Sequence, residues 1–179
     1  ISRFENAQTM REVKKINKII LKNAINTLED SEVITIDFDT TDDRTHGHQQ
    51  LSFFNGYYHH HIYHQLIVTL NNRLAFVLLK PGNVHVNKGA APILRMIVKE
   101  IRKRYPDGEI IFRADGGFAT PKLYNMAEKL EICYTIAMIS NNRLKKFSNQ
   151  KSSKAQRNYN DYGQKATYYN ECQYQADSW

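Results

Sequence analysis

Apolar residues recur along the chain with two different periods, and the order of these periods predicts a mixed α/β fold. Over residues 7–30 they recur every three or four positions, opposite a face of lysines and arginines, which predicts an amphipathic helix. Residues 33–39, 61–70 and 73–80 are rich in β-branched side chains and predict strands. The Asn71-Asn72 pair predicts a tight turn, so the last two strands should form a hairpin.

In the second half of the chain, helical and strand patterns alternate. An apolar stripe predicts a helix over 88–104 with Asn87 as its N-cap. A further helix is predicted from Pro121 to about Leu130, with Thr120 as its N-cap. The remaining segments are predicted as strands at 109–115, 133–140 and 166–175, and as a loop or short helix at 142–158.

This order of elements predicts where a site would form. A right-handed crossover from the first three strands makes the strand at 109–115 parallel to its neighbour. If it lies beside the strand at 33–39, the carboxyl ends of the two strands meet, and ligand sites form at such ends in open α/β sheets. Asp39 and Asp115 end these two strands, so we expect their carboxylates to converge.

Converging carboxylates repel one another unless a cation lies between them. Oxygen ligands without thiolates favour Mg²⁺ or Mn²⁺ over zinc, and such ions can support phosphoryl transfer. Asp37 shares a strand face with Asp39 and is therefore a further candidate ligand or supporting group. For Asp42 and Asp43 we favour the simpler interpretation that they cap turns.

The charge of the chain favours a polyanionic partner. The formal net charge is +7, and residues 142–158 contain basic side chains but no acidic ones. The candidate DNA-binding residues in this segment are Arg143, Lys145, Lys146, Lys151 and Lys154. Two widely separated cysteines and the lack of a long apolar run lead us to expect a soluble cytoplasmic protein with no membrane partner, associated with the nucleoid.

Several motifs together carry a family resemblance. They are SRFEN (2–6), DFDTTDDRTHG (37–47), FFNGYY (53–58), LLKPGNVH (78–85) and FRADGGFATPKLY (112–124). In order and spacing they resemble the catalytic domain of bacterial insertion-sequence transposases of the DDE type, which belong to the ribonuclease H-like/retroviral integrase superfamily. The resemblance spans nearly the whole chain and implies a ribonuclease H-like mixed sheet.

The resemblance also implies a reaction and its site. By motif position Asp39 and Asp115 correspond to the first two ligands of Mg²⁺ or Mn²⁺. The expected activity is metal-dependent cleavage of DNA at transposon ends, followed by attack of the freed 3′-hydroxyl on target DNA. The expected partners are both of these DNAs and, in the full-length protein, a second copy in a homodimer.

The chain departs from the family pattern in one respect. The family's third carboxylate is a Glu on a helix after the fifth strand, in a Tyr…Arg…Glu…Lys signature, and no such signature follows Ser140. We therefore expect this Glu beyond Trp179, after a β-rich insertion. The expected division is an N-terminal helix and linker (1–32), a partial catalytic core (33–160) and the start of the insertion (161–179).

Two other functions remain open on the sequence. A fragment without the third carboxylate could bind DNA without cutting it. DFDTT also fits the DxDxT motif of haloacid-dehalogenase-type phosphatases, in which Asp37 would be the nucleophile and Asp39 the acid/base.

The histidines at positions 59, 60, 61 and 64 form a further group. They resemble a metal cluster, but neighbours on a strand point to opposite faces, so we favour packing roles for them.

Overall fold

The structure, a computed structural model, describes residues 9–29, 33–47 and 49–175. They form two compact units, one extending to Ala137 and the other beginning at Met138. The motif at 2–6 and the ends of the helix predicted over 7–30 lie outside the described residues. None of the described helices is both long and apolar enough to cross a membrane.

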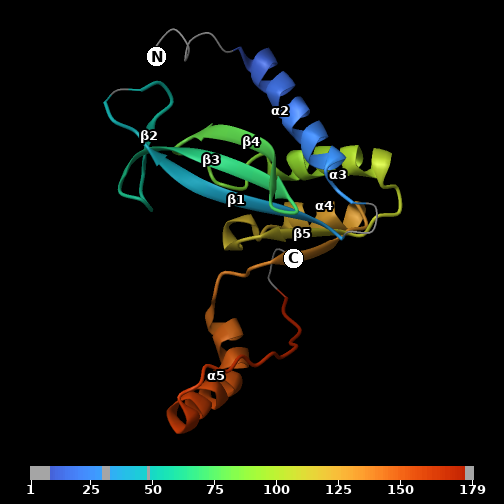
Figure 1. Cartoon of the computed structure of the whole chain (residues 1–179). Coiled ribbons are helices and arrows are strands. Elements are labelled where there is room, and N and C mark those ends of the chain that lie inside the picture. The colour runs from blue at the N-terminus through green and yellow to red at the C-terminus, as the bar shows by residue number, and fades with distance from the viewer. Residues whose placement is uncertain (1–8, 30–32, 48, 176–179) are drawn as a thin grey trace. The chain divides into compact units, whose positions relative to one another are not determined.

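The first unit combines a six-stranded sheet with three α-helices in its described part (Figure 1). In chain order its elements are α2 (Met10–Asn26), β1 (Ile34–Arg44), β2 (Phe53–Asn55), β3 (His60–Leu70), β4 (Arg73–Pro81), α3 (Ala90–Arg104), β5 (Ile110–Ala114), the 3-10 helix η1 (Gly116–Phe118), α4 (Pro121–Lys129) and β6 (Cys133–Ile136).

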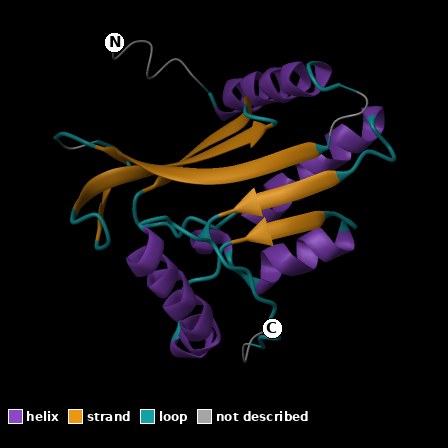
Figure 2. Ribbon diagram, turned by 60° about the horizontal axis from the view of Figure 1, so that its bottom comes forward, coloured by secondary structure: helices purple, strands orange, loops and turns teal. Residues whose placement is uncertain are grey.

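The sheet is mixed, as predicted. Its strand order is β2-β3-β1-β5-β6, and β4 also pairs with β3. The pairs that β3 makes with β1, β2 and β4 are antiparallel, whereas β1–β5 and β5–β6 are parallel. In Figure 2 the arrowheads of the parallel strands β5 and β6 point the same way. The pairing of β1 with β5 places the strands that carry or precede Asp39 and Asp115 side by side, as the expected convergence requires.

One apolar core lies between the helices and one face of the sheet. Phe38 of β1 contacts Phe112 of β5 and Phe118 of η1 edge-to-face, with ring centroids 5.1 and 5.8 Å apart. All three rings are nearly inaccessible to solvent. Burial of this size contributes about 2 kcal/mol per aromatic side chain, so these rings fix the register of β1 against β5.

Helix α2 covers the outer edge of β4. The capping box of Thr9 and Glu12 begins the helix, as both reciprocal hydrogen bonds are present. Further along the helix, the buried Asn17 side chain donates Nδ2 to the carbonyl of Val77 and accepts from the amide of Val77, both at 2.9 Å. The carboxamide thus takes the place of a neighbouring strand at an edge that would otherwise be open.

Some boundaries differ from the predicted ones. Strand β1 continues to Arg44, so Asp39 lies within the strand and does not end it, and Asp42 and Asp43 lie on the strand and do not cap turns. The N-cap of α3 is Gly89, with a φ of 81°, and not Asn87. The prediction failed there because Asn87 closes the preceding turn with its backbone, accepting from the amide of Ala90.

The second unit differs most from the prediction. Residues 142–158 are part of α5 (Asn142–Tyr162), a regular helix capped by Asn141, which accepts from the amide of Leu144. No strand forms over 166–175 within the described residues. Most side chains in this segment are polar, so neither set of alternate residues forms an apolar face, and Tyr169 is 88% exposed. Without an apolar face or a neighbouring strand, such a segment gains little from an extended ladder.

Candidate metal and phosphodiester site

The register of β1 and β5 brings Asp39 and Asp115 to the same edge of the sheet. Phe38 is paired with Ala114 in the parallel ladder, and the two aspartates are the next residues along each strand. Because side chains alternate, the burial of Phe38 turns Asp39 away from the core. Asp39 and Asp115 thus both follow the last pair of this ladder, although β1 itself continues to Arg44.

Each of these carboxylates is oriented by an amide from its own chain segment. Asp39 accepts from the amide of Thr40 at 2.8 Å, and Asp115 accepts from the amide of Gly117 at 2.9 Å. In both cases the acceptor is Oδ1, and Oδ2 has no hydrogen-bond partner in the described part of the chain. Both side chains are accessible to solvent. A hydrated cation can therefore reach both free oxygens.

Gly117 makes the close approach at Asp115 possible. A Cβ at this position would lie 2.8 Å from Val86 Cγ2 and 3.1 Å from Asp115 Oδ1. The second glycine of the Gly116-Gly117 pair thus lets η1 begin directly at the carboxylate, and Asp115 serves as the N-cap of η1.

Asp37 is bonded to an arginine. Arg113 donates Nε to Oδ1 at 2.6 Å and Nη2 to Oδ2 at 2.8 Å. This bidentate bond and the carboxylate charge raise the pKa of Arg113. Each oxygen of Asp37 thus accepts one hydrogen bond from Arg113, whereas Oδ2 of Asp39 and of Asp115 has no such partner in the described residues.

The three aspartates and Arg113 line one open cavity of about 700 Å³. The other lining residues are Phe38, Ile67, Thr69, Asn72, Ala114, Thr135, Ile136 and Ala137. All of them belong to the first unit. The cavity wall combines apolar and small polar side chains, and its charged groups belong to the middle of β1 and to β5 with the residue that follows it.

Among the described residues the cavity is lined by three carboxylates, of which Asp37 is paired with Arg113 and Asp39 and Asp115 are not paired with a basic side chain. In the same part of the chain, no group of three or more His, Cys, Asp or Glu side chains could hold a metal ion. Glu128 accepts from the Tyr134 hydroxyl at 2.8 Å, and Glu131 lies in a left-handed turn after α4. Hard, accessible oxygens fit Mg²⁺ or Mn²⁺, and two carboxylates supply part of such a ligand set.

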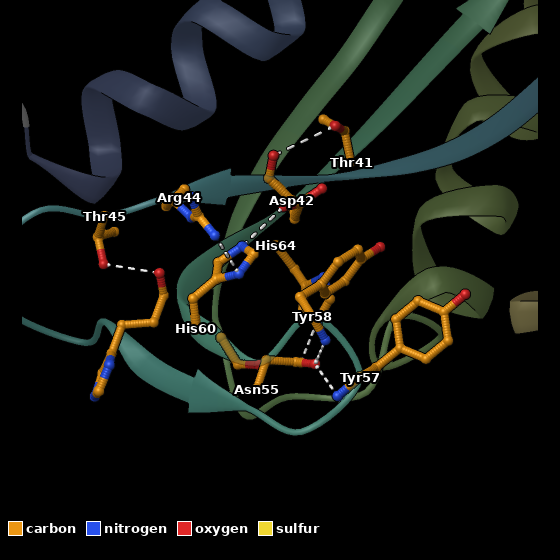
Figure 3. A network of polar contacts seen from close by, with 11 residues as sticks. Thr41, Asp42, Arg44, Thr45, Asn55, Tyr57, Tyr58, His60 and His64 are labelled. Atoms are coloured by element: carbon orange, nitrogen blue, oxygen red, sulfur yellow. Dashed lines mark hydrogen bonds and ion pairs between the residues drawn. The ribbon is translucent and has the colours of Figure 1, made fainter.

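A polar network lies further along β1 (Figure 3). His60 Nε2 is 3.3 Å from Asp42 Oδ2, and its Nδ1 is 3.1 Å from Arg44 Nη2. Arg44 can only donate, so Nδ1 is the acceptor and Nε2 carries the proton that faces Asp42. His60 and Asp42 therefore have structural partners in this network.

Two ionisable groups are buried next to it. His64 and Lys80 face each other across β3 and β4 and are 4% and 5% exposed. Burial lowers the pKa of Lys80 to about 8, and burial and the Lys80 charge lower the pKa of His64. Lys80 donates to the carbonyl of Val86, whereas His64 Nδ1 has no partner among the described residues.

Asn55, on β2, is hydrogen-bonded to His64 of the buried His64–Lys80 pair. It donates Nδ2 to His64 Nε2 at 3.1 Å and to the carbonyl of Gly82 at 2.8 Å. Its Oδ1 accepts from the amides of Tyr57 and Tyr58 (Figure 3). Burial raises the pKa of Tyr58, as do the charges of Asp42, Asp115 and Asp39.

Sequence reasoning missed this role of Asn55 and the strand β2 that contains it. The pattern offers little signal, because β2 has only three residues and two of them are exposed. The Asn-Gly pair in FFNGYY was the available indication, since Asn side chains commonly bond to amides two residues further on.

The five candidate DNA-binding residues all lie on α5, in the second unit. Lys151 is half-buried, and Arg143, Lys145, Lys146 and Lys154 are exposed. Two of them have partners within the unit. Arg143 donates to the carbonyl of Gln175 at 3.2 Å, and the Lys154 ammonium lies 4.9 Å from the centre of the Tyr168 ring. Lys145 and Lys146 carry charge that is accessible from solvent.

Solved structures with similar folds include forms of the Mos1 transposase. The crystal structure of the catalytic domain of Mos1 mariner transposase matches with a TM-score of 0.42 and 12% sequence identity, over 82% of this chain and 72% of that chain. The domain with raltegravir and Mg gives 0.40 at 12% identity, over 71% of this chain and 62% of that one. The Mos1 paired-end complex with the left transposon end gives a TM-score of 0.37 at 13% sequence identity, over 74% of this chain and 43% of that chain.

The present chain therefore spans less than two thirds of several of these proteins. No curated protein sequence matches it. A family model does so over its whole length, residues 1–179, and its description is transposase DDE domain group 1. With two aspartates directly after the last pair of the parallel β1–β5 ladder, in a mixed sheet of the expected kind, this chain belongs to the family of DDE-domain transposases.

Proposed function

We propose that this chain is the core of a catalytic domain that cleaves and joins DNA phosphodiester bonds during transposition. The observation that carries the proposal is the pairing of β1 with β5, which brings Asp39 and Asp115 to one open cavity. Membership of the transposase family supports the same reaction. The substrates would be the ends of the transposon and a target DNA, and the full-length protein would act as a homodimer.

In this proposal Asp39 and Asp115 would hold Mg²⁺ or Mn²⁺. When bound, such ions would supply activation of the attacking oxygen and stabilisation of the leaving one. The amides of Thr40 and Gly117 hold the carboxylates in place, so little reorganisation is needed when the substrate binds. The third carboxylate that the resemblance implies would come from a helix beyond Trp179.

The decisive experiment replaces each carboxylate by its amide. In the full-length protein that contains this chain, we expect Asp39→Asn and Asp115→Asn each to reduce strand cleavage and strand transfer to background, because an amide binds a divalent cation poorly. Circular dichroism and denaturant unfolding should remain as in the wild type, since neither Oδ2 atom has a partner in the described residues.

The matched control is Asp43→Asn. This residue also lies exposed on the outer face of β1, but it accepts from Gln65 Nε2 at 3.1 Å. The control should keep nearly full activity. Strand transfer by either Asp39→Asn or Asp115→Asn at the wild-type rate would contradict the assignment.

A second candidate function is DNA binding without cleavage. It is favoured by one observation, namely that no group of three or more His, Cys, Asp or Glu side chains among the described residues could hold a metal ion. Salt-sensitive binding of this chain to duplex DNA with no nicking in Mn²⁺, in a protein whose downstream sequence lacks a helical Glu, would support it. The phosphatase alternative would require Asp37 to give up two hydrogen bonds from Arg113 before it could attack a phosphate.

A further inference from the structure

An arginine is held on the same face of the sheet as the two candidate metal ligands. Arg113 and Asp37 are direct partners in the parallel ladder, two positions before Asp115 and Asp39. Alternation therefore gives all four side chains one face. Two residues of strand span about 6.6 Å, so Arg113 and Asp37 are separated by about this distance along their strands from Asp115 and Asp39.

The hydrogen bonds to Asp37 leave much of the guanidinium available. A guanidinium has five N–H donors in a rigid fork. Asp37 accepts one from Nε and one from Nη2, and the other three have no acceptor in the described part of the chain. The Arg113 side chain is 53% exposed, and it lines the same cavity as Asp39 and Asp115.

Stability alone does not account for this pair. An exposed ion pair contributes little to folding. The cross-strand neighbours of Asp37 and Arg113 are Thr69 and Thr135, which are uncharged, so no further charge in these ladders calls for the pair. What the bond does achieve is to direct Arg113. An unrestrained guanidinium at this position could instead pair with Asp39 or Asp115 and compete with a metal ion for their oxygens.

We propose that Arg113 forms a phosphate-binding subsite beside the metal site, and that Asp37 is the positioning residue that aims it. The ligand would be a phosphodiester of the bound DNA strand, next to the one that reacts. This inference rests on the proposed function, and it assigns Asp37 a role other than metal ligation. The planar fork of an arginine suits a phosphate because it can offer two parallel N–H donors.

The first test measures binding of this chain to a fluorescein-labelled DNA duplex over a range of salt concentrations. We expect Arg113→Gln to bind about tenfold more weakly and to reduce the slope of log affinity against log salt by about one. The matched control is Lys129→Gln, which removes the same charge from an exposed position on α4, the helix that packs on the other face of the sheet.

The second test separates positioning from metal ligation, using Mn²⁺ binding followed by electron paramagnetic resonance. Arg113→Gln should keep the wild-type Mn²⁺ affinity. Asp37→Asn alone should weaken it, because Arg113 is released toward Asp39 and Asp115. The double variant should recover the affinity of Arg113→Gln, whereas a true ligand at Asp37 would leave the double variant as weak as Asp37→Asn.

The outcomes distinguish this inference from the function on which it rests. An unchanged salt slope in Arg113→Gln, or an equal loss of affinity in Lys129→Gln, would overturn the subsite while the DNA-cleaving function stands. A double variant that stays weak for Mn²⁺ would overturn the role of Asp37. Failure of the wild-type chain to bind duplex DNA at any salt concentration would overturn the subsite and the proposed function together.

Discussion

Lys80 is a buried cation without a carboxylate partner in the described residues. Its ammonium group donates to the Val86 carbonyl, and its neighbour across the strands is His64, whose pKa is also lowered. A pKa of about 8 in place of 10.5 means that burial of the charged form costs about 3 kcal/mol. This lysine therefore lowers the stability of the fold at neutral pH.

The stability of the chain should consequently rise with pH. The folded-state pKa of Lys80 is depressed, so the unfolded chain binds more protons between about pH 8 and 10.5. We expect the free energy of unfolding to increase by about 2 kcal/mol from pH 7 to pH 9.5, and this increase to be absent in Lys80→Met. Urea unfolding at the two pH values measures it, and an equal increase in the variant would contradict the buried-charge account.

At the scale of elements, the short strand β2 depends on a close backbone contact. A Cβ added to Gly82 would lie 2.7 Å from the carbonyl oxygen of Phe53 and would also overlap the carbonyl oxygen of Ile62. Only glycine lets the chain after β4 pass this close to both β2 and β3. The Gly82 carbonyl in turn accepts from Asn55, which orders the turn that carries Tyr57 and Tyr58.

Adding a methyl group there should displace β2. We expect Gly82→Ala to destabilise the first unit by more than about 2 kcal/mol, because the atoms in the way are backbone and cannot rotate aside. Gly56→Ala is the control, since a Cβ at Gly56 meets nothing within 4 Å and its φ is not positive. Its effect on urea unfolding should stay within about 1 kcal/mol. Equal stabilities of the two variants would show that the contact is not tight.

The elements that could be predicted from sequence are those with a strong periodic pattern. Helices α3 and α4, the β3–β4 hairpin and the buried strands β1 and β5 follow the apolar pattern, and the handedness of crossovers then predicted that β5 is parallel to its neighbour. The three-residue strand β2 has too short a pattern to recognise. The length of α5 was missed because its stripe is weak and none of its residues is fully buried.

The same distinction applies to the candidate site. Asp39 and Asp115 could be expected close together because parallel neighbouring strands bring corresponding positions side by side, and each aspartate follows the last pair of that ladder. The bond between Asp37 and Arg113 could not, because it depends on the register of two strands separated by 76 positions in the sequence. Alternation correctly indicated that Asp37 shares a face with Asp39, but only the cross-strand partner reveals that its oxygens are occupied.

On the scale of the whole molecule, the net charge of +7 is distributed over several helices. Helix α5 has one acidic residue, Asp161, near its end. Helix α2 also carries exposed lysines, at positions 14, 18 and 22. If DNA responds only to net charge, the lysines of α2 and of α5 should contribute equally to binding. If DNA phosphates contact one surface, the lysines of α5 alone should contribute.

Comparing triple variants distinguishes these possibilities. We expect Lys145→Gln/Lys146→Gln/Lys154→Gln to reduce the slope of log affinity for duplex DNA against log salt by up to about 2.7, because each phosphate that a lysine neutralises adds about 0.9 to the slope. The matched variant Lys14→Gln/Lys18→Gln/Lys22→Gln has the same net charge and should reduce the slope by less than about 0.9. Fluorescence anisotropy over a salt series measures both slopes. Equal reductions would mean that DNA responds to the net charge of the molecule, and α5 would then lose its assignment as the DNA-binding element.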